Sequence, residues 1–243
     1  MKIIFGLLLF VSVICSAQTR IIAHRGYWKT ENSAQNSISS LKNAQFLNVY
    51  GSEFDVRMTK DGKLIVNHDE DINGLIIADT SYSKLKKIRL KNGEKIPTLK
   101  QYLKQGKKDS SMRLIIELKP AKTQLLEKDI VEKAINEVRK AGVEKQSEFI
   151  SFSLNICKEL KRNASEFSVQ YLNGELTPSE LKQLGLNGFD YHYKILQKNP
   201  EWIGEAKKLG LISNSWTVND PEIFKELKAL GIDFITTDIP NEF

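Results

Sequence analysis

The chain has 243 residues, with 36 Lys and Arg against 30 Asp and Glu, which gives a formal net charge of +6 at pH 7. This length suits one domain or two small ones, and a single domain is the simpler expectation. No nucleic-acid-binding motif accompanies the positive charge, so a nucleic-acid partner is not expected.

The first 17 residues have the layout of a secretory signal peptide. A single charge at Lys2 precedes an apolar run, which is followed by small residues ending at Ala17. The apolar run is shorter than the roughly 20 residues that span a bilayer, so we expect cleavage after Ala17. Lipoprotein processing at Cys15 is the weaker alternative, because the bulky Ile14 precedes it. The prediction is an exported protein, periplasmic or secreted, with no transmembrane segment in its mature form.

Removal of the signal peptide leaves 243 − 17 = 226 residues and one cysteine, Cys157. No intramolecular disulfide is then available, so the stability of the mature chain must come from a packed core. Six basic residues lie between Lys84 and Lys95. This basic run predicts a solvated face, and weak contact with an anionic membrane surface is the alternative.

Short apolar runs alternate with segments of helical periodicity along the mature chain, which is the pattern of an α/β protein. Several helical segments begin at Ser, Thr, Asp or Pro and end at Gly. The predicted strands are 20–24, 49–56, 64–67, 112–118, 148–152, 168–172, 188–191, 211–216 and 234–236. The predicted helices are 33–46, 99–106, 123–141, 154–163, 178–184, 201–209 and 221–230.

Nine predicted strands exceed by one the eight places of a (β/α)8 barrel. The third strand is the extra one, because it follows the second too closely for a helix to intervene and Asp61-Gly62 between them is a strong hairpin signal. A two-residue turn at Asp61-Gly62 pairs Asp55 with His68 and places both on one face. We therefore predict a single TIM (β/α)8 barrel over residues 18–243, with a small β-hairpin insertion after strand 2.

Polar residues close most of the predicted strands, and catalytic groups in such barrels lie at the carboxyl ends of the strands. Glu53 and Asp55 are two apart on one strand, so both side chains point to the same face. Glu117 supplies a third carboxylate from another strand end. Hard oxygen ligands favour one divalent cation, Mg²⁺ or Ca²⁺, over zinc. The alternative is that these carboxylates pair with Arg25 or Lys119 without a metal.

Two of the three histidines, His24 and His68, also stand at strand ends in this set. Phosphodiester hydrolysis needs a base for the attacking oxygen and an acid for the departing one, and imidazoles perform both near neutral pH. Arg25 and Lys119 can stabilise the charge of the phosphoryl oxygens. Trp216 either fills the barrel core or packs against substrate carbons.

These strand-end residues fall in the order seen in one enzyme family. The motifs are His24-Arg25-Gly26, Glu31-Asn32, Glu53-x-Asp55-Val56, Asp61-Gly62, His68-Asp69, Glu117-Leu118-Lys119, Trp216-Thr217-Val218-Asn219 and Thr237-Asp238-x-Pro240. In this order the chain resembles the glycerophosphodiester phosphodiesterases over nearly all of its mature length. The resemblance implies a barrel with a hairpin-like insertion, and cleavage of small anionic glycerophosphodiesters to an alcohol and sn-glycerol 3-phosphate with Mg²⁺ or Ca²⁺. It assigns catalysis to His24 and His68, phosphate binding to Arg25, and the metal to Glu53, Asp55 and Glu117.

The chain departs from the family pattern around the expected mouth of the barrel. Thr30 replaces the usual Pro before Glu31-Asn32, and the segment after His68 is atypical. These changes leave the reaction type intact and put the substrate in question. A lipid or a glycerol-phosphate polymer is therefore an alternative substrate, and a noncatalytic phosphodiester-binding protein is the alternative outside the enzymes. A glycosidase with Glu53 and Glu117 as its carboxylate pair would leave the histidines without a role.

Overall fold

The computed structural model describes residues 18–243, so the predicted signal peptide lies outside the described residues. Eight parallel strands form a closed barrel, because β1 pairs with both β2 and β11. In barrel order the strands are β1 (Arg20–Ala23), β2 (Gly51–Met58), β6 (Arg113–Leu118), β7 (Ser147–Ser151), β8 (Ser168–Tyr171), β9 (Gly188–His192), β10 (Ile212–Trp216) and β11 (Phe234–Thr237). The predicted TIM barrel is confirmed.

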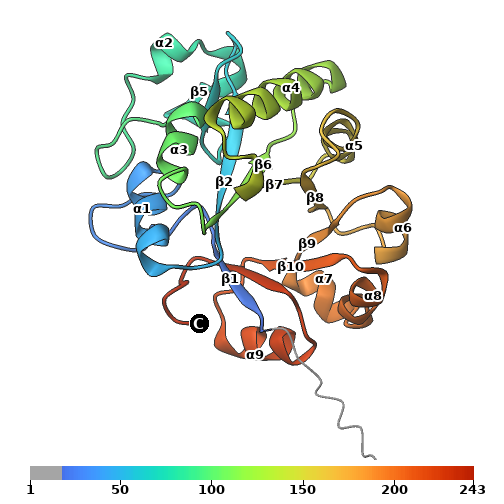
Figure 1. Ribbon diagram of the computed structural model, residues 1–243. Coiled ribbons are helices and arrows are strands. Elements are labelled where there is room, and N and C mark those ends of the chain that lie inside the picture. Colours follow the sequence, from blue (N-terminus) through green and yellow to red (C-terminus); the bar gives the residue numbers. More distant parts are fainter. Residues whose placement is uncertain (1–17) are drawn as a thin grey trace, which may run out of the picture.

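Helices surround the strands as an outer ring (Figure 1). They are α1 (Ile38–Leu47), α3 (Leu99–Gly106), α4 (Gln124–Ala141), α5 (Leu154–Asn163), α6 (Pro178–Gln183), α7 (Tyr193–Lys198), α8 (Glu201–Leu209) and α9 (Pro221–Ala229), with a 3-10 turn at Glu144–Gln146. The expected caps are present at several helix starts: for example, the side chains of Thr98 and Ser153 accept a hydrogen bond from the first turn. Within the described residues, no helix is long and apolar enough to cross a membrane.

Two helices differ from the prediction. The segment predicted as a helix from residue 33 becomes helical only at Ile38, because Asn36 adopts a left-handed φ of 61° and the Ser37 side chain caps the helix start. The sequence analysis also missed α7, a six-residue helix that follows β9 directly. It is capped by the ring of His192, whose Nδ1 accepts a hydrogen bond from the Lys194 amide at 3.2 Å.

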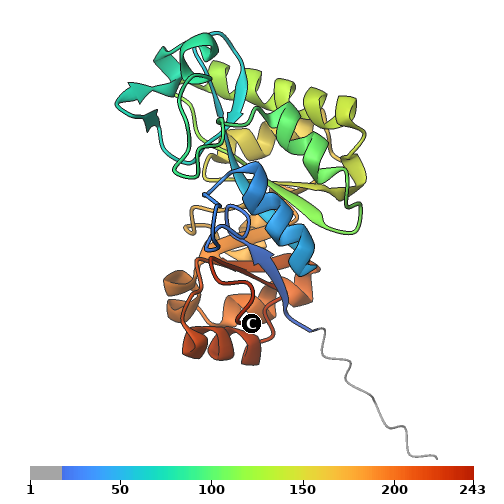
Figure 2. The ribbon, with the colours of Figure 1, turned by 90° about the vertical axis from the view of Figure 1, so that its left-hand side faces the viewer.

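The insertion after β2 is larger than the predicted hairpin. It contains β3 (Leu64–Val66), β4 (Asp71–Ile72), β5 (Leu75–Ile76), a 3-10 turn at Ile77–Asp79 and α2 (Tyr82–Leu85). Figures 1 and 2 both show this teal segment on one side of the barrel, beside β2 and α4. The insertion has its own small core around Ile65, Ile77, Leu85 and Ile96.

The predicted register of the first hairpin is wrong by one residue. The strand β3 does run antiparallel to β2, but Val56 lies opposite Val66, so the Asp55 carbonyl accepts a hydrogen bond from Asn67 rather than from His68. A two-residue type I′ turn needs positive φ at both central residues. Here only Gly62 has a positive φ, of 75°, and the loop contains three residues.

Alternate residues of the barrel strands serve two separate cores. On β6, Leu114 and Ile116 pack outward under the helices, whereas Ile115 points into the barrel. The inner core joins Ile115 to Ile22, Ile150, Leu172 and Phe234. This apolar centre separates the polar side chains at the carboxyl end of the barrel from those at the amino end.

Candidate active site

A tight turn after β1 positions the first site residues. The His24 amide donates a hydrogen bond to the Thr237 carbonyl at 2.9 Å, which ties the turn to β11. Arg25 and Gly26 both adopt positive φ, 56° and 74°. A side chain at Gly26 would bring a Cβ to 2.5 Å from Ser40 Oγ, so this position accepts only glycine. The turn directs the Arg25 amide toward a Glu53 carboxylate oxygen at 2.8 Å.

The three predicted metal-binding carboxylates converge at the carboxyl end of the barrel. Glu53 and Asp55 project from one face of β2, and Asp55 lies beside Glu117 in the β2–β6 register. One oxygen from each carboxylate can be chosen so that all lie within 4.8 Å of one another. The three side chains are buried, with exposed fractions of 3%, 1% and 7% for Glu53, Asp55 and Glu117.

Burial and mutual repulsion make this cluster costly to ionise. Burial raises the pKa of Glu53 well above its ordinary value, and the charges of Asp55 and Glu117 raise it further. Burial and Asp55 raise the pKa of Glu117 to about 7. In addition, Glu53 Oε1 is buried without a hydrogen-bond partner. An unpaired buried oxygen in a set of hard oxygen donors fits a divalent cation.

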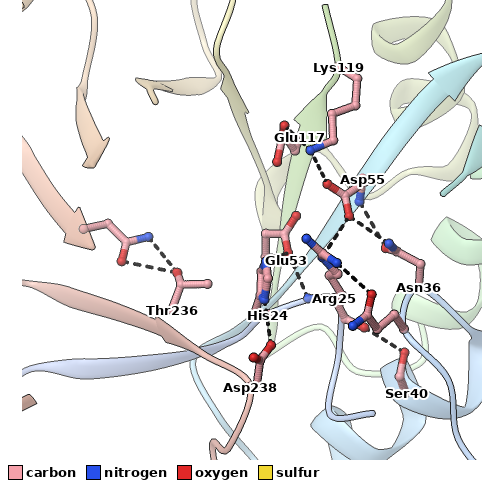
Figure 3. A network of polar contacts seen from close by, with 12 residues as sticks. His24, Arg25, Asn36, Ser40, Glu53, Asp55, Glu117, Lys119, Thr236 and Asp238 are labelled. Carbon is pink, nitrogen blue, oxygen red and sulfur yellow. Dashed lines mark hydrogen bonds and ion pairs between the residues drawn. The ribbon is translucent and has the colours of Figure 1, made fainter. Parts of the chain in front are cut away.

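Two basic side chains offset part of this negative charge (Figure 3). Lys119 Nζ lies 2.7 Å from Asp55 Oδ1 and 2.6 Å from Glu117 Oε1, and Arg25 Nε lies 3.6 Å from Asp55 Oδ2. Burial alone would raise the pKa of Asp55, but the charges of Lys119, His68 and Arg25 hold it below its usual range. Asp55 is therefore ionised at neutral pH. The cluster still contains three carboxyl groups against these two basic side chains.

The sequence analysis missed Asn36, which holds Asp55 from the other side. Its Nδ2 donates a hydrogen bond to Asp55 Oδ2 at 2.8 Å, and its Oδ1 accepts one from the Asp55 amide at 3.1 Å. Asn36 is 3% exposed. Because it lies in an irregular loop before α1, no periodicity or strand end marked its position.

His24 is oriented by Asp238, which directly follows β11, the strand that pairs with β1. Its Nδ1 lies 2.7 Å from Asp238 Oδ1, and its Nε2 lies 4.0 Å from Glu53 Oε2. Asn219 holds the Asp238 carboxylate with a 2.8 Å hydrogen bond from its Nδ2. Burial would raise the pKa of Asp238, but the hydrogen bond and charge of His24 lower it to about 2. The sequence analysis found Asp238 at a strand end without recognising this contact.

His68 reaches the same region from the insertion despite the error in register. It lies two residues beyond the end of β3, and Arg57 Nε donates a hydrogen bond to its carbonyl at 2.8 Å. Burial lowers the pKa of His68, while the charge of Asp55 raises it. The ring therefore lies within electrostatic range of the carboxylate cluster. Its side chain is 38% exposed, and its Nδ1 contacts Asp69 Oδ1 at 2.8 Å.

Aromatic side chains pack together around Trp216 at the end of β10. The Trp216 ring packs edge-on against Phe152 at 5.5 Å and against His192 at 5.1 Å, and its Nε1 donates a hydrogen bond to the Asp190 carbonyl at 3.0 Å. Trp216 belongs to the edge of the inner core and is partly exposed. Both interpretations from the sequence, core packing and a substrate contact, are compatible with this position.

Comparison with known proteins gives consistent matches. Residues 24–242 match the model of the glycerophosphoryl diester phosphodiesterase family. A glycerophosphodiester phosphodiesterase of Caldanaerobacter subterraneus is 31% identical over 238 residues, which cover 92% of this chain and 95% of that protein. The crystal structure of a glycerophosphodiester phosphodiesterase from Parabacteroides distasonis superposes with a TM-score of 0.92 at 50% identity, covering 93% of this chain and 95% of that one. The fold also matches an Oleispira antarctica phosphodiesterase, solved with sn-glycerol-3-phosphate, at a TM-score of 0.80 and 22% identity, with 93% and 95% coverage.

Proposed function

The chain belongs to the glycerophosphoryl diester phosphodiesterase family and is a phosphoric diester hydrolase, and we propose that it uses a divalent cation and two histidines to release sn-glycerol 3-phosphate from glycerophosphodiesters. The observation that carries the proposal is the convergence of Glu53, Asp55 and Glu117 within 4.8 Å beside His24. Three buried carboxylates at this spacing need a compensating positive charge, and the phosphodiester group of the substrate brings a further negative charge beside them.

The cation, Mg²⁺ or Ca²⁺, would be held by Glu53, Asp55 and Glu117. When bound, it would act as a Lewis acid toward the phosphoryl oxygens. Lys119 and Arg25 already contact the carboxylates, so they can turn their remaining donors toward the same phosphate. Trp216 would limit the space beside the phosphate and pack against substrate carbons.

His24 and His68 would transfer the protons. One imidazole removes the proton from the oxygen that attacks phosphorus, and the other protonates the alcohol oxygen as its bond to phosphorus breaks. The ionised Asp238 accepts a hydrogen bond from the Nδ1–H group of His24, which leaves Nε2 as the ring nitrogen that faces Glu53. Because burial lowers the pKa of His68, a neutral ring is available at pH 7 to accept a proton.

Hydrolysis of glycerophosphoethanolamine by purified residues 18–243 tests the proposal. We expect glycerol 3-phosphate as the product with Mg²⁺ or Ca²⁺, loss of turnover in chelator, and recovery when the cation is returned. Turnover that is indifferent to chelator would reject the cation. Binding without any cleavage would instead identify a noncatalytic protein.

Export is a separate part of the proposal and rests on the composition of residues 1–17. The full chain, expressed in a bacterial host, should appear outside the cytoplasm with Gln18 as its first residue. Retention of the intact N-terminus in the cytoplasmic fraction would contradict export without affecting the catalytic proposal.

A further inference from the structure

Positive charge is concentrated in one segment of the chain. Residues 84–108 contain ten Lys and Arg residues but only one acidic residue, Glu94, and this excess is larger than the net charge of +6 of the whole chain. All ten basic side chains are exposed, and none makes an ion pair with any residue that the structure describes. Glu94 offsets little of this charge, because its carboxylate accepts hydrogen bonds from the Ile38 and Ser39 amides. The segment therefore presents positive charge that the protein itself does not neutralise.

Part of this charge lines a groove of about 380 Å³ between the insertion, α3 and the start of α1. Lys95 reaches the groove from the insertion, where it pairs with Arg89 in a short antiparallel bridge. Lys104 and Lys108 line the same groove from the end of α3. They are four residues apart, so their side chains lie on one side of the chain. The groove thus brings together lysines from two segments.

The helix α1 extends this surface past the groove. Its first residue, Ile38, also lines the groove, and Lys42 and Phe46 follow at four-residue spacing along the same side of the helix. Lys42 is exposed. Phe46 is 94% exposed, the largest exposed fraction among the large apolar side chains of the described residues. A single exposed ring needs no explanation by itself, but this one lies beside a group of unpaired lysines.

Reciprocal hydrogen bonds hold α1 against α3 at the level of Phe46. Gln45 Nε2 donates to the Gln105 carbonyl at 3.3 Å, and Gln105 Nε2 donates to Gln45 Oε1 at 2.8 Å. Figures 1 and 2 show the blue α1 beside the green α3 on the outside of the barrel. The two helices and the insertion therefore share one outer surface, the α1–α3 face, which consists of Lys42, Phe46, Lys95, Lys104 and Lys108.

We propose that the α1–α3 face docks on the surface of a bilayer that contains anionic lipids. The lysines would lie against the negative head groups, and the Phe46 ring would enter the interfacial layer of the bilayer. A glycerol-phosphate polymer would match the lysines but has no apolar part to cover the exposed ring. The inference goes beyond the proposed function, because the face lies on the outer ring of helices. Docking there would leave the carboxyl end of the barrel open to soluble diesters.

Vesicle binding provides the first test. Purified residues 18–243 are mixed with vesicles of phosphatidylcholine alone, or of phosphatidylcholine with phosphatidylglycerol, and the bound fraction is measured by sedimentation. We expect binding to the anionic vesicles alone at about 0.1 M salt and release at about 1 M, because the screening length falls from roughly 10 to 3 Å. No binding to the anionic vesicles, or equal binding to the neutral ones, would overturn the proposal.

Neutralising two lysines of the face provides the second test. Each lysine near an anionic surface contributes about fivefold to binding, so Lys104→Gln with Lys108→Gln should weaken vesicle binding roughly 10- to 30-fold. Lys207→Gln with Lys208→Gln is the matched control, because it removes the same charge from two exposed lysines on α8, on another side of the barrel (Figure 1). Equal losses in the two double variants would show that net charge alone drives binding, and would overturn the assignment to this face.

Replacing Phe46 separates a bilayer from a soluble polyanion. Phe46→Ser should weaken binding to the anionic vesicles about 10-fold, whereas Phe46→Trp should keep it, because an indole ring also suits the membrane interface. Thermal unfolding checks that both variants fold, as expected at so exposed a position. If Phe46→Ser binds the vesicles as wild type does, while polyphosphate or oligothymidylate displaces the protein from them, the face binds a soluble polyanion and the bilayer proposal is wrong.

These measurements require no turnover, so they are independent of the proposed function. A protein that binds anionic vesicles through this face but cleaves no diester keeps the docking surface and loses the proposed hydrolysis. A protein that cleaves glycerophosphoethanolamine but does not bind anionic vesicles loses the docking surface alone.

Discussion

The two ends of the barrel interior contain similar charged and aromatic residues with opposite consequences. At the amino end, Arg20 stacks on Tyr50 and Phe234, with its guanidinium carbon 4.2 and 4.4 Å from the ring centroids. The Tyr50 hydroxyl donates a 2.8 Å hydrogen bond to Glu148 Oε1, and Arg113 Nε lies 3.5 Å from the same oxygen. These contacts give each of the charged groups at this end a partner.

At the carboxyl end the charges are not balanced. Three buried carboxylates face Lys119 and Arg25, and Glu53 Oε1 has no hydrogen-bond partner. The same kinds of residue therefore close one end of the barrel and leave the other ready for a ligand. The carboxyl end is thus distinguished by acidic groups that its own bases do not balance, and not simply by the number of its polar side chains.

Replacing His24, at the carboxyl end, is expected to have the largest effect on activity. His24→Gln keeps a polar side chain of similar length but cannot transfer a proton, so kcat should fall by roughly 10²–10⁴-fold. Steady-state hydrolysis of glycerophosphoethanolamine measures the change, and thermal unfolding should show an intact fold. His192→Gln is the matched control, because the His192 ring caps α7 and lies outside the carboxylate cluster. Full activity in His24→Gln would remove this residue from the mechanism.

The unbalanced charge at the carboxyl end also predicts how stability depends on pH. The raised pKa values of Glu53 and Glu117 mean that the folded protein holds extra protons relative to the unfolded chain between pH 4.5 and about 7. Their contribution to stability is therefore complete below pH 4.5 and is lost as pH rises through 7. In chelator, the free energy of unfolding should fall by roughly 1–3 kcal/mol between pH 5 and 8 from these groups. Added Mg²⁺ or Ca²⁺ should reverse the loss at pH 8.

Glu117→Gln isolates this effect from the other titrating groups. The lowered pKa values of His68 and His192 act in the opposite direction below pH 6.5, so the pH dependence of wild-type stability is the sum of both effects. The variant should be less dependent on pH and more stable than wild type in chelator at pH 8, yet inactive. Chemical unfolding at a series of pH values measures both proteins. Identical slopes would show that Glu117 titrates normally in the folded state.

Asp238→Asn should have a smaller effect, because Asp238 acts through His24. The amide keeps the size of the side chain but removes the negative charge that orients the ring. Loss of a partner of this kind typically costs 10–100-fold, so we expect kcat to fall by about that factor with KM unchanged. A rise in KM without a change in kcat would indicate that Asp238 contacts the substrate instead. Thr236→Ser, on β11 two residues before Asp238, is the control for local packing, because it keeps the hydroxyl that bonds to Asn214.

The sequence predicted the barrel well because its signals repeat in every unit. Alternating strands and capped helices mark each repeat, and the carboxyl ends of parallel strands must meet, so the strand-end residues Glu53, Asp55 and Glu117 could be grouped from the sequence. The predictions that were wrong concerned the backbone conformation of single residues. The Asp61-Gly62 pair was taken as a two-residue turn, although only Gly62 has a positive φ. The two-residue turn occurs instead at Asn73-Gly74, between β4 and β5, where both residues have positive φ.

The hairpin error did not displace His68 from the site, for a physical reason. A register slip reverses the face of residues that remain within the strand pairing. His68 lies beyond the end of β3, in a segment tied to β2 by the hydrogen bond from Arg57, so its ring direction does not follow the strand alternation. Asn36, by contrast, could not be predicted from the sequence. Its contact with Asp55 depends on a left-handed φ of 61° in a loop, which no pattern of apolar residues reports.

Glu148→Gln should have the smallest effect. It tests whether the amino end of the barrel contributes to stability without contributing to catalysis. The amide oxygen can still accept the hydrogen bond from Tyr50, so only the charge interaction with the half-exposed Arg113 is lost. We expect the free energy of unfolding to fall by about 1 kcal/mol, with kcat and KM unchanged. Urea unfolding and steady-state kinetics on the same preparation measure the two quantities. A loss of activity without a loss of stability would mean that the two ends of the barrel are coupled through the apolar centre, and their roles could then no longer be separated.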